Sequence, residues 1–465
     1  MTAQTSFDAL LAMNGKAELR DAAAAENKTL PIHRWVPWIA GFSAQFVEDA
    51  ISAYLPDKES DDQLVLDPFA GVGTTQVEAL RAGRSTFGYE INAFAALAAN
   101  AKVMCVDASP DALRARVEAF RSTMSPFESD VDAAWKAGGA DALAEKLALL
   151  RGENWSGYRS RIPFFSPPVE VKFLYALQHA ATLREPHRTL FRTALGATMV
   201  SISNYSYEPS LSSRPGAGKP LIENTSVIEP VGAKLDDMCA DIEWARTTYG
   251  ARWRRRNRSI IHGSYFDSDL TPRSVALVVT SPPYMNNYHY IRNTRPQLHW
   301  LGLMNDARDL QDYEQQSFGK FWQTVRQGKP VGLAVNSYAL RQKIDHLREL
   351  SPERGQYGGP GWANYVATYM NDTDRFAALL KRHLQPGARA VVVVGNSIIQ
   401  GIEFKVDHLL AEIAERRGLA VDDIHIVRTK RVGNSIIDSS VRNGHAENGA
   451  KHTTQLYDAA VVLRR

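Results

Sequence analysis

The feature that most constrains the fold of this chain is an apolar strand that runs directly into a glycine turn and a helix. Residues 64–66 lead into Asp67-Pro68-Phe69-Ala70-Gly71-Val72-Gly73-Thr74-Thr75. Glycine has no Cβ, so Gly71 and Gly73 allow a sharp bend and the close approach of a ligand to the main chain. Apolar residues in 74–81 then recur with the spacing of a helix that faces a sheet. These residues predict a strand–turn–helix unit of an α/β fold.

A second strand, residues 85–89, ends in the acid Glu90. An acid at this position is well placed to accept hydrogen bonds from ribose hydroxyls. No Gly-Lys-Ser/Thr follows the glycines, so the turn does not match a phosphate-binding P-loop. A dinucleotide-binding fold and an ordinary tight turn both stay open, although Asp67-Pro68-Phe69 is unusual for the dinucleotide fold.

The other informative motif follows a later apolar strand, residues 275–279, and reads Ser281-Pro282-Pro283-Tyr284. An exocyclic amine of a nucleobase is a poor nucleophile, because its lone pair is delocalised into the ring. A hydroxyl and a carbonyl can accept its two hydrogens, and two prolines would hold these acceptors in place. The tyrosine ring offers a surface for an extruded base. A plain Pro-Pro turn is the alternative, since Ser166-Pro167-Pro168 occurs without a preceding strand and is interpreted as a loop before a helix.

Together the two motifs resemble those of the S-adenosylmethionine (SAM)-dependent DNA amino-methyltransferases. The first has the complete Asp-Pro-Phe-x-Gly-x-Gly-Thr-Thr form, and residues 33–38 and 42–46 resemble the segment that closes over the methionine end of SAM. The resemblance implies catalytic roles for Ser281, Pro282, Pro283 and Tyr284. It implies cofactor contacts by Phe42, Ser43, Asp67, Phe69, Gly71, Gly73, Thr74, Thr75, Glu90 and Asn92. Many relatives have an acid at the position of Ser264, for which Asp267 is a candidate replacement.

Serine at the start of the second motif resembles the cytosine-N4 branch of this family, whereas aspartate is the common adenine-N6 form. We therefore expect N4 methylation of cytosine in DNA, with adenine-N6 or RNA-base methylation as the alternative. Cytosine-C5 methylation needs a cysteine nucleophile, usually after a proline, and Cys105 and Cys239 both follow methionine. An alternative of another class is a catalytically silent DNA-binding module, against which the intact motifs argue. No metal-ligand spacing is present, so no metal is expected.

Composition indicates a globular protein of a reducing cytoplasm without a membrane partner. Hydrophobic residues make up 44% of the 465 residues, there are two cysteines, and no signal peptide or apolar run of membrane length occurs. The net charge of +3 identifies no partner, but five arginines crowd near Trp253: Arg252, Arg254, Arg255, Arg256 and Arg258. They are candidates for DNA phosphate contacts, or else a solvated helix face. Asn286 and Tyr288 directly follow the second motif and are candidates for the base pocket. The resemblance implies double-stranded DNA as partner, and a cognate restriction endonuclease if the chain serves a restriction-modification or phage-defence system.

The expected fold is a Rossmann-like α/β methyltransferase sheet with a reversed edge strand and a largely helical insertion. Further strands are predicted at 259–262, 388–394, 424–428 and 458–463. Residues 1–106 would form the N-terminal part of the catalytic domain, with the cap and the SAM loop. Residues 107–255 would form the helical insertion, a candidate target-recognition region. Residues 256–465 would complete the catalytic domain and carry a second insertion, 285–387.

Overall fold

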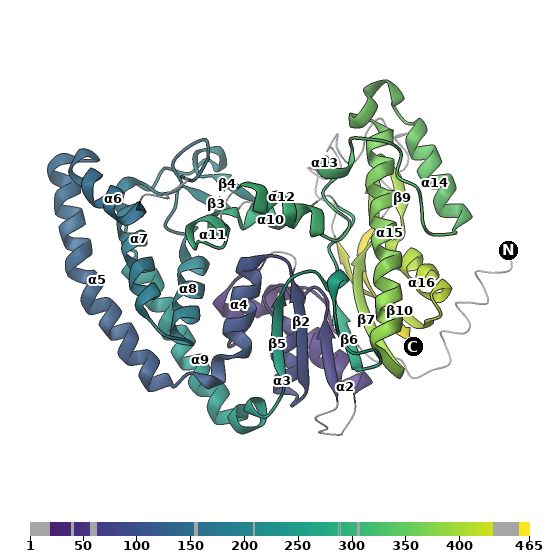
Figure 1. Ribbon diagram of the computed structural model, residues 1–465, viewed down its shortest axis with the longest axis horizontal. Helices are drawn as coiled ribbons and strands as arrows, with labels where there is room; N and C mark the ends of the chain where they lie inside the picture. The colour runs from purple at the N-terminus through teal and green to yellow at the C-terminus, as the bar shows by residue number, and fades with distance from the viewer. Residues whose placement is uncertain are drawn as a thin grey trace.

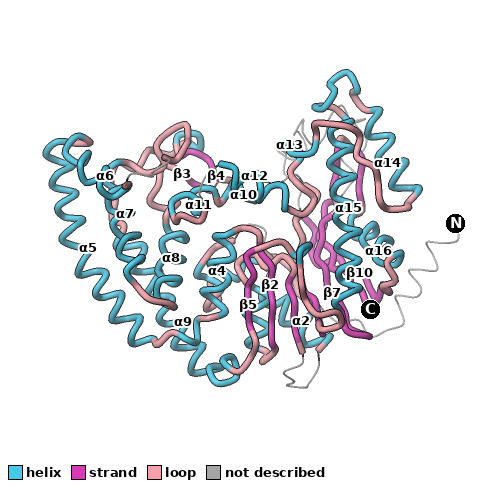
Figure 2. Tube along the Cα trace, viewed as in Figure 1, coloured by secondary structure: helices cyan, strands magenta, loops and turns pink. Residues whose placement is uncertain are grey.

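The structure is a computed structural model that describes residues 19–38, 41–55, 63–152, 157–207, 210–286, 288, 290–304, 307–430 and 455–465. In these residues seven strands form one sheet, which lies at the centre of the molecule between helices (Figures 1 and 2). Its strands are β1 (Leu64–Asp67), β2 (Ser85–Glu90), β5 (Arg258–His262), β6 (Val275–Thr280), β7 (Leu384–Gly395), β10 (Ala420–Lys430) and β11 (Leu456–Arg464).

The strand order across the sheet is β10-β11-β7-β6-β1-β2-β5. Neighbours from β7 to β5 pair in parallel, and β11 is antiparallel to both β7 and β10. The predicted fold class is confirmed, and the reversed strand lies one position in from the edge, with β10 outermost. Because parallel strands end at the same edge of a sheet, the residues that follow β1, β2, β5 and β6 meet there.

Helices cover both faces of the sheet, as alternation along the strands requires. Val65, Leu277 and Val391 lie on the face covered by α2 (Ala44–Tyr54). Leu66 and Val392 point to the opposite face, which is covered by α15 (Gly359–His383) and α16 (Val406–Arg416).

Two further helices connect the first strands. They are α3 (Thr74–Arg81), whose bounds match the prediction, and α4 (Ala93–Val103). The Asn92 side chain caps α4 by accepting hydrogen bonds from the Phe94 and Ala95 backbone N–H groups, at 3.1 and 3.2 Å.

Residues 107–255 are mainly helical, as predicted, and their helices stand beside α4 (Figure 1). They comprise α5 (Pro110–Gly138), α6 (Ala144–Arg151), α7 (Pro167–Thr182), α8 (His187–Thr198) and α9 (Ile228–Arg254), with a short hairpin of β3 (Tyr205–Tyr207) and β4 (Leu211–Ser213). α7 and α8 are separate helices, and Pro167 and Pro168 are the first residues of α7.

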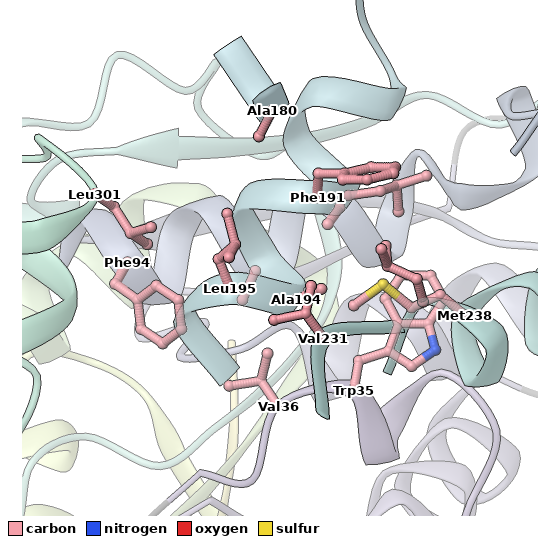
Figure 3. Packing of buried hydrophobic residues seen from close by; sticks show 14 of the residues in the cluster. Trp35, Val36, Phe94, Ala180, Phe191, Ala194, Leu195, Val231, Met238 and Leu301 are labelled. Carbon is pink, nitrogen blue, oxygen red and sulfur yellow. The ribbon is translucent and has the colours of Figure 1, made fainter. Parts of the chain in front are cut away.

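The core of this insertion continues into the catalytic part of the chain. Figure 3 shows Leu195 of α8 between Phe94 of α4 and Val231 of α9, with Trp35 close by. A Cβ at Gly196 would lie only 2.2 Å from the Phe94 ring, so α8 and α4 approach closely. The insertion is therefore packed on the sheet domain.

The region 285–387 divides into two parts. Its first part holds short helices: α10 (Tyr290–Asn293), α11 (Arg295–Trp300), α12 (Ala307–Gln316), α13 (Trp322–Val325) and α14 (Tyr338–Glu349). Its last part is α15, which packs on the sheet and connects β6 to β7, so it belongs to the catalytic layers. A small hairpin of β8 (Ser397–Ile399) and β9 (Ile402–Phe404) follows β7. Within the described ranges, no helix is long and apolar enough to cross a membrane.

Candidate active site

A cavity at the carboxyl edge of the sheet brings the two sequence motifs together. Its space, counted with the open mouth, is about 1340 Å³. From the predicted cofactor set it is lined by Phe42, Phe69, Gly71, Thr74, Glu90 and Asn92. From the predicted catalytic and base-pocket sets it is lined by Ser281, Pro282, Pro283, Tyr284 and Tyr288.

The two glycines of the turn have different structural roles. Gly71 has a positive φ of +51° and faces the cavity, and its N–H donates a 2.8 Å hydrogen bond to the Glu90 carboxylate. Gly73 has a φ of +84° and begins α3 away from the cavity, where a Cβ would lie 3.1 Å from that of Ala99. Gly73 is therefore required for the close packing of α3 against α4 rather than for contact with a ligand.

Glu90 is held at the cavity wall by two main-chain donors. One carboxylate oxygen accepts from Gly71 N and the other from Asn92 N, at 2.8 and 2.7 Å. Each oxygen keeps a lone pair for a further donor such as a ribose hydroxyl. Burial raises the pKa of Glu90 from 4.5 to about 7, so its charge changes near neutral pH.

Asp67 lies beneath the cavity and connects the two motifs. It is fully buried and accepts hydrogen bonds from Phe69 N at 3.0 Å, Thr75 Oγ1 at 2.8 Å and Thr280 Oγ1 at 2.5 Å. Thr280 immediately precedes Ser281, so this carboxylate fixes the second motif relative to the glycine turn. Burial raises the pKa of Asp67 from 3.8 to about 6.

Several predicted site residues are not on the cavity wall. Asp67 and Thr75 bond to each other below it, and Gly73 packs against α4. The Ser43 hydroxyl donates to Gln45 Oε1 at 2.7 Å, at the start of α2. Asn286 turns the chain after Tyr284, with its N–H bonded to the Tyr284 carbonyl at 2.8 Å. These residues shape the site without lining it.

The N-terminal segment contributes two wall residues that were not among the predicted cofactor contacts, Trp38 and Gly41, although Trp38 lies in the segment 33–38 that the resemblance had identified. The indole Nε1 of Trp38 lies 3.3 Å from where a Cβ on Gly71 would be, so the indole lies against the glycine turn. The segment before Trp38 is hydrogen-bonded to Asp241 of α9, which accepts from Ile32 N at 2.8 Å and from Trp35 Nε1 at 2.9 Å. The aromatic residues in 33–38 were the available signal for this wall.

The residues after β5 form a third side of the cavity. Ser264 lines it, next to Tyr265 and Phe266. Asp267, the candidate replacement for the missing acid, is not on the wall; its side chain is 75% exposed and lies 3.7 Å from Arg375. This side of the cavity is therefore mainly apolar and aromatic, and Ile91, which follows the neighbouring strand β2, adds to it.

The Ser-Pro-Pro-Tyr loop is held from the other face by α15. The Tyr369 hydroxyl donates a 2.9 Å hydrogen bond to the carbonyl of Pro283. Burial raises the pKa of Tyr284 well above its ordinary value of 10.0, so the phenol is neutral throughout the working pH range. The cavity wall here is therefore a loop fixed by α15 that carries an uncharged ring.

A second cavity adjoins the first and shares Trp38, Tyr288 and Tyr290 with it. Its outer wall comes from the insertion, with Tyr205 and Tyr207 of β3. The Tyr207 hydroxyl donates to the carbonyl of Asn293 at 3.0 Å. The helical insertion therefore borders the site, and a role for it in target recognition stays a prediction.

The arginine cluster lies at the opposite end of the sheet. Arg258 is the first residue of β5 and pairs with Thr86, whereas His262 at the cavity end of the strand pairs with Glu90. His262 lies four residues further along the strand than Arg258, a distance of about 13 Å. Arg252 binds the carbonyl of Ala82, and Arg254 binds the carbonyl of Val106. Arg258 binds the carboxylate of Asp107. Arg256 is buried. Of these five arginines, Arg254 and Arg255 are exposed to solvent. A phosphate role for this cluster stays a prediction, while the observed contacts support a structural role.

Comparison with known proteins agrees with the motifs. The DNA methylase family of N6 and N4 methyltransferases matches residues 24–101. The chain is 22% identical over 444 residues to the type II methyltransferase M.BsoBI of Geobacillus stearothermophilus, covering 88% of this chain and 82% of the relative. It is 23% identical over 435 residues to the type II methyltransferase M.AvaI of Nostoc sp., covering 88% and 83%. The chain is thus similar to the DNA methylase family over residues 24–101 and to two type II methyltransferases over most of its length.

Proposed function

We propose that this protein transfers a methyl group from SAM to the exocyclic N4 amine of cytosine in double-stranded DNA. The observation that carries the proposal is the single cavity in which Glu90 and Gly71 on one side face Ser281 and Tyr284 on the other. A site for methyl transfer must hold donor and acceptor side by side. The match to the DNA methylase family supports DNA as the substrate.

The residues on the first side of the cavity fit SAM. Glu90 offers free carboxylate lone pairs to the ribose hydroxyls, and the Gly71 turn lets the ligand approach the main chain. Ile91 and Phe266 offer apolar surface to the adenine. Trp38 and Phe42 close the side that faces the methionine end. When bound, SAM supplies the electrophilic methyl group on its sulfonium.

The second side has the acceptors for an amine. The Ser281 hydroxyl and the Pro282 carbonyl can accept the two hydrogens of the amino group and draw its nitrogen toward tetrahedral geometry. The Tyr369 hydroxyl on Pro283 keeps this loop from shifting. The Tyr284 ring gives the flipped base a stacking surface.

Cytosine is favoured over adenine because the first residue of the motif is a neutral serine. Its hydroxyl accepts a hydrogen bond but is not a strong base, and the cytosine amine needs only acceptors. Both relatives are named type II methyltransferases, which supports a restriction-modification context with a cognate endonuclease as partner.

Mass analysis of nucleosides tests the proposal. Unmethylated bacterial DNA and bacterial RNA are each incubated with the protein and with SAM labelled in its methyl group, and are then digested to nucleosides. Label in N4-methylcytosine is the expected result. Label in N6-methyladenine, or in RNA alone, would overturn the cytosine assignment, and no label in any base would overturn the methyltransferase function.

The matched variants are Ser281→Ala and Ser166→Ala, because both serines precede a Pro-Pro pair. Ser166 precedes α7 in the insertion and does not line the cavity. We expect Ser281→Ala to remove most labelling and Ser166→Ala to keep it. Equal labelling by both variants would remove Ser281 from the chemistry.

A further inference from the structure

The reversed strand β11 brings a buried carboxylate to the Ser-Pro-Pro-Tyr loop. Asp458 lies near the start of β11 and pairs with Gly395 at the end of β7. Because β11 runs against its neighbours, its start lies at the edge where the parallel strands end. Asp458 is only 5% exposed.

Asp458 and Tyr284 meet over Gly395. A Cβ on Gly395 would lie 3.0 Å from Asp458 Oδ1 and 3.2 Å from the Tyr284 ring, so a side chain there would displace both. Hydrogen bonds link the Tyr284 side chain to both Asp458 and Ser281. Asp458, Tyr284 and Ser281 thus form a row of three residues that are joined by hydrogen bonds and come from two distant parts of the chain.

The direction of each hydrogen bond in this row follows from the donors available. A carboxylate can only accept, so the single phenolic proton of Tyr284 is donated to Asp458. Toward Ser281 the phenol oxygen can then only accept, which means that the Ser281 hydroxyl donates to it. The lone pairs of Ser281 are left pointing elsewhere as acceptors. The neutral state of Tyr284 is consistent with this arrangement.

We propose that Asp458 is a positioning residue that acts through the Tyr284 hydroxyl to hold Ser281 as an acceptor for the target amine. This inference rests on the proposed function, and it adds a residue from β11 and a role for the phenol group as well as the ring. Asp458 itself does not touch the base. Without the row, the Ser281 hydroxyl is free to turn its proton toward the amine, where it would repel the N–H groups.

The neighbouring residue provides a matched control. Tyr457 also donates its hydroxyl to a buried aspartate, Asp407, at 3.1 Å, but neither residue lines the cavity. Tyr457→Phe therefore removes a tyrosine–aspartate bond next door without disturbing the Ser281 row. The methylation rate of Tyr457→Phe therefore shows how far the loss of such a bond acts through stability alone.

The test is a double-mutant cycle on the single-turnover methylation rate at saturating SAM and DNA. Tyr284→Phe keeps the ring and Asp458→Leu removes the carboxylate, and each is expected to lower the rate roughly tenfold or more, with SAM affinity unchanged. If Asp458 acts through Tyr284, adding Asp458→Leu to Tyr284→Phe lowers the rate no further. Tyr457→Phe is expected to leave the rate unchanged.

Each outcome supports or overturns the positioning role of Asp458. Multiplying losses in the double variant, or a Tyr284→Phe rate equal to that of the unsubstituted protein, would overturn the positioning role. A loss in Tyr457→Phe as large as in Tyr284→Phe would assign the effect to stability and also overturn it. If the unsubstituted protein labels no cytosine, the proposed function fails instead, so the two failures are distinguishable. Asp458→Asn, whose amide oxygen can still accept from the phenol, should restore much of the rate lost in Asp458→Leu.

Discussion

Replacing Asp67 with asparagine is expected to change how the stability of the fold depends on pH. Asparagine keeps an oxygen that can accept from Phe69 N and the Thr280 hydroxyl. The Thr75 hydroxyl lies 3.1 Å from the carbonyl of Val279, so it can donate there and accept from the new amide. The substitution therefore retains the hydrogen bonds and removes only the titration.

The magnitude follows from the pKa of Asp67, which burial raises from 3.8 to about 6. Over this interval the folded protein holds a proton that the unfolded chain has lost, so the group stabilises the fold below pH 4 and loses that contribution as pH rises through 6. The difference is worth about 3 kcal/mol. The free energy of unfolding of Asp67→Asn, minus that of the unsubstituted protein, should therefore rise by about 2.4 kcal/mol from pH 4 to pH 7.

Urea denaturation of both proteins at several pH values measures this difference. Glu90 titrates in an overlapping range, but it is present in both proteins and cancels to first order. Asp67→Ala is the companion variant. It also lacks the titration but leaves the donors of Phe69 and Thr280 unpaired, so it should be less stable than Asp67→Asn by about 2–6 kcal/mol at every pH. A difference between Asp67→Asn and the unsubstituted protein that does not vary with pH would refute the reasoning.

Three further predictions concern the glycine turn, the ribose contact and the arginines. Gly73→Ala puts a Cβ at a φ of +84°, 3.1 Å from that of Ala99, and should lower the free energy of unfolding by about 1–3 kcal/mol; an unchanged denaturation midpoint would contradict this. SAM affinity, measured by calorimetry, should fall as pH drops below about 7, because protonated Glu90 accepts fewer hydrogen bonds, and Glu90→Gln should remove this dependence. Arg254→Ala and Arg258→Ala should lower stability while the salt dependence of DNA binding stays the same; a smaller salt slope would instead support phosphate contacts.

The local elements of the catalytic part were predictable because each has a strong sequence signal. The apolar run of β1, the glycine turn and the apolar spacing of α3 agree with one another, and the observed bounds of α3 match the prediction. The apolar runs of β6 and β7 likewise fix strands that are buried on both faces. That the two motifs meet in one cavity followed from the resemblance, because nothing local specifies strand order.

Side-chain direction was not predictable. A motif shows that Asp67 and Gly73 matter, but not that one faces the next strand and the other a helix. The arginine cluster has the composition of a phosphate site, and only the position of α9 shows that Arg254 and Arg258 bind the protein itself. Asp458 is a single acid in an apolar strand, and it gains its place only when β11 runs against its neighbours.

The tie between Asp241 and the segment ending at Trp38 has a consequence for how the two substrates bind. Asp241 lies on α9 of the insertion, and the segment it holds leads to the cofactor wall. Under the proposed function, a shift of α9 on DNA binding would be passed toward Trp38 through the hydrogen bonds that Ile32, Arg34 and Trp35 donate to Asp241. Thermodynamic linkage then requires reciprocity: the factor by which DNA tightens cofactor binding equals the factor by which cofactor tightens DNA binding. Asp241→Asn, which weakens the tie, should bring both factors closer to one.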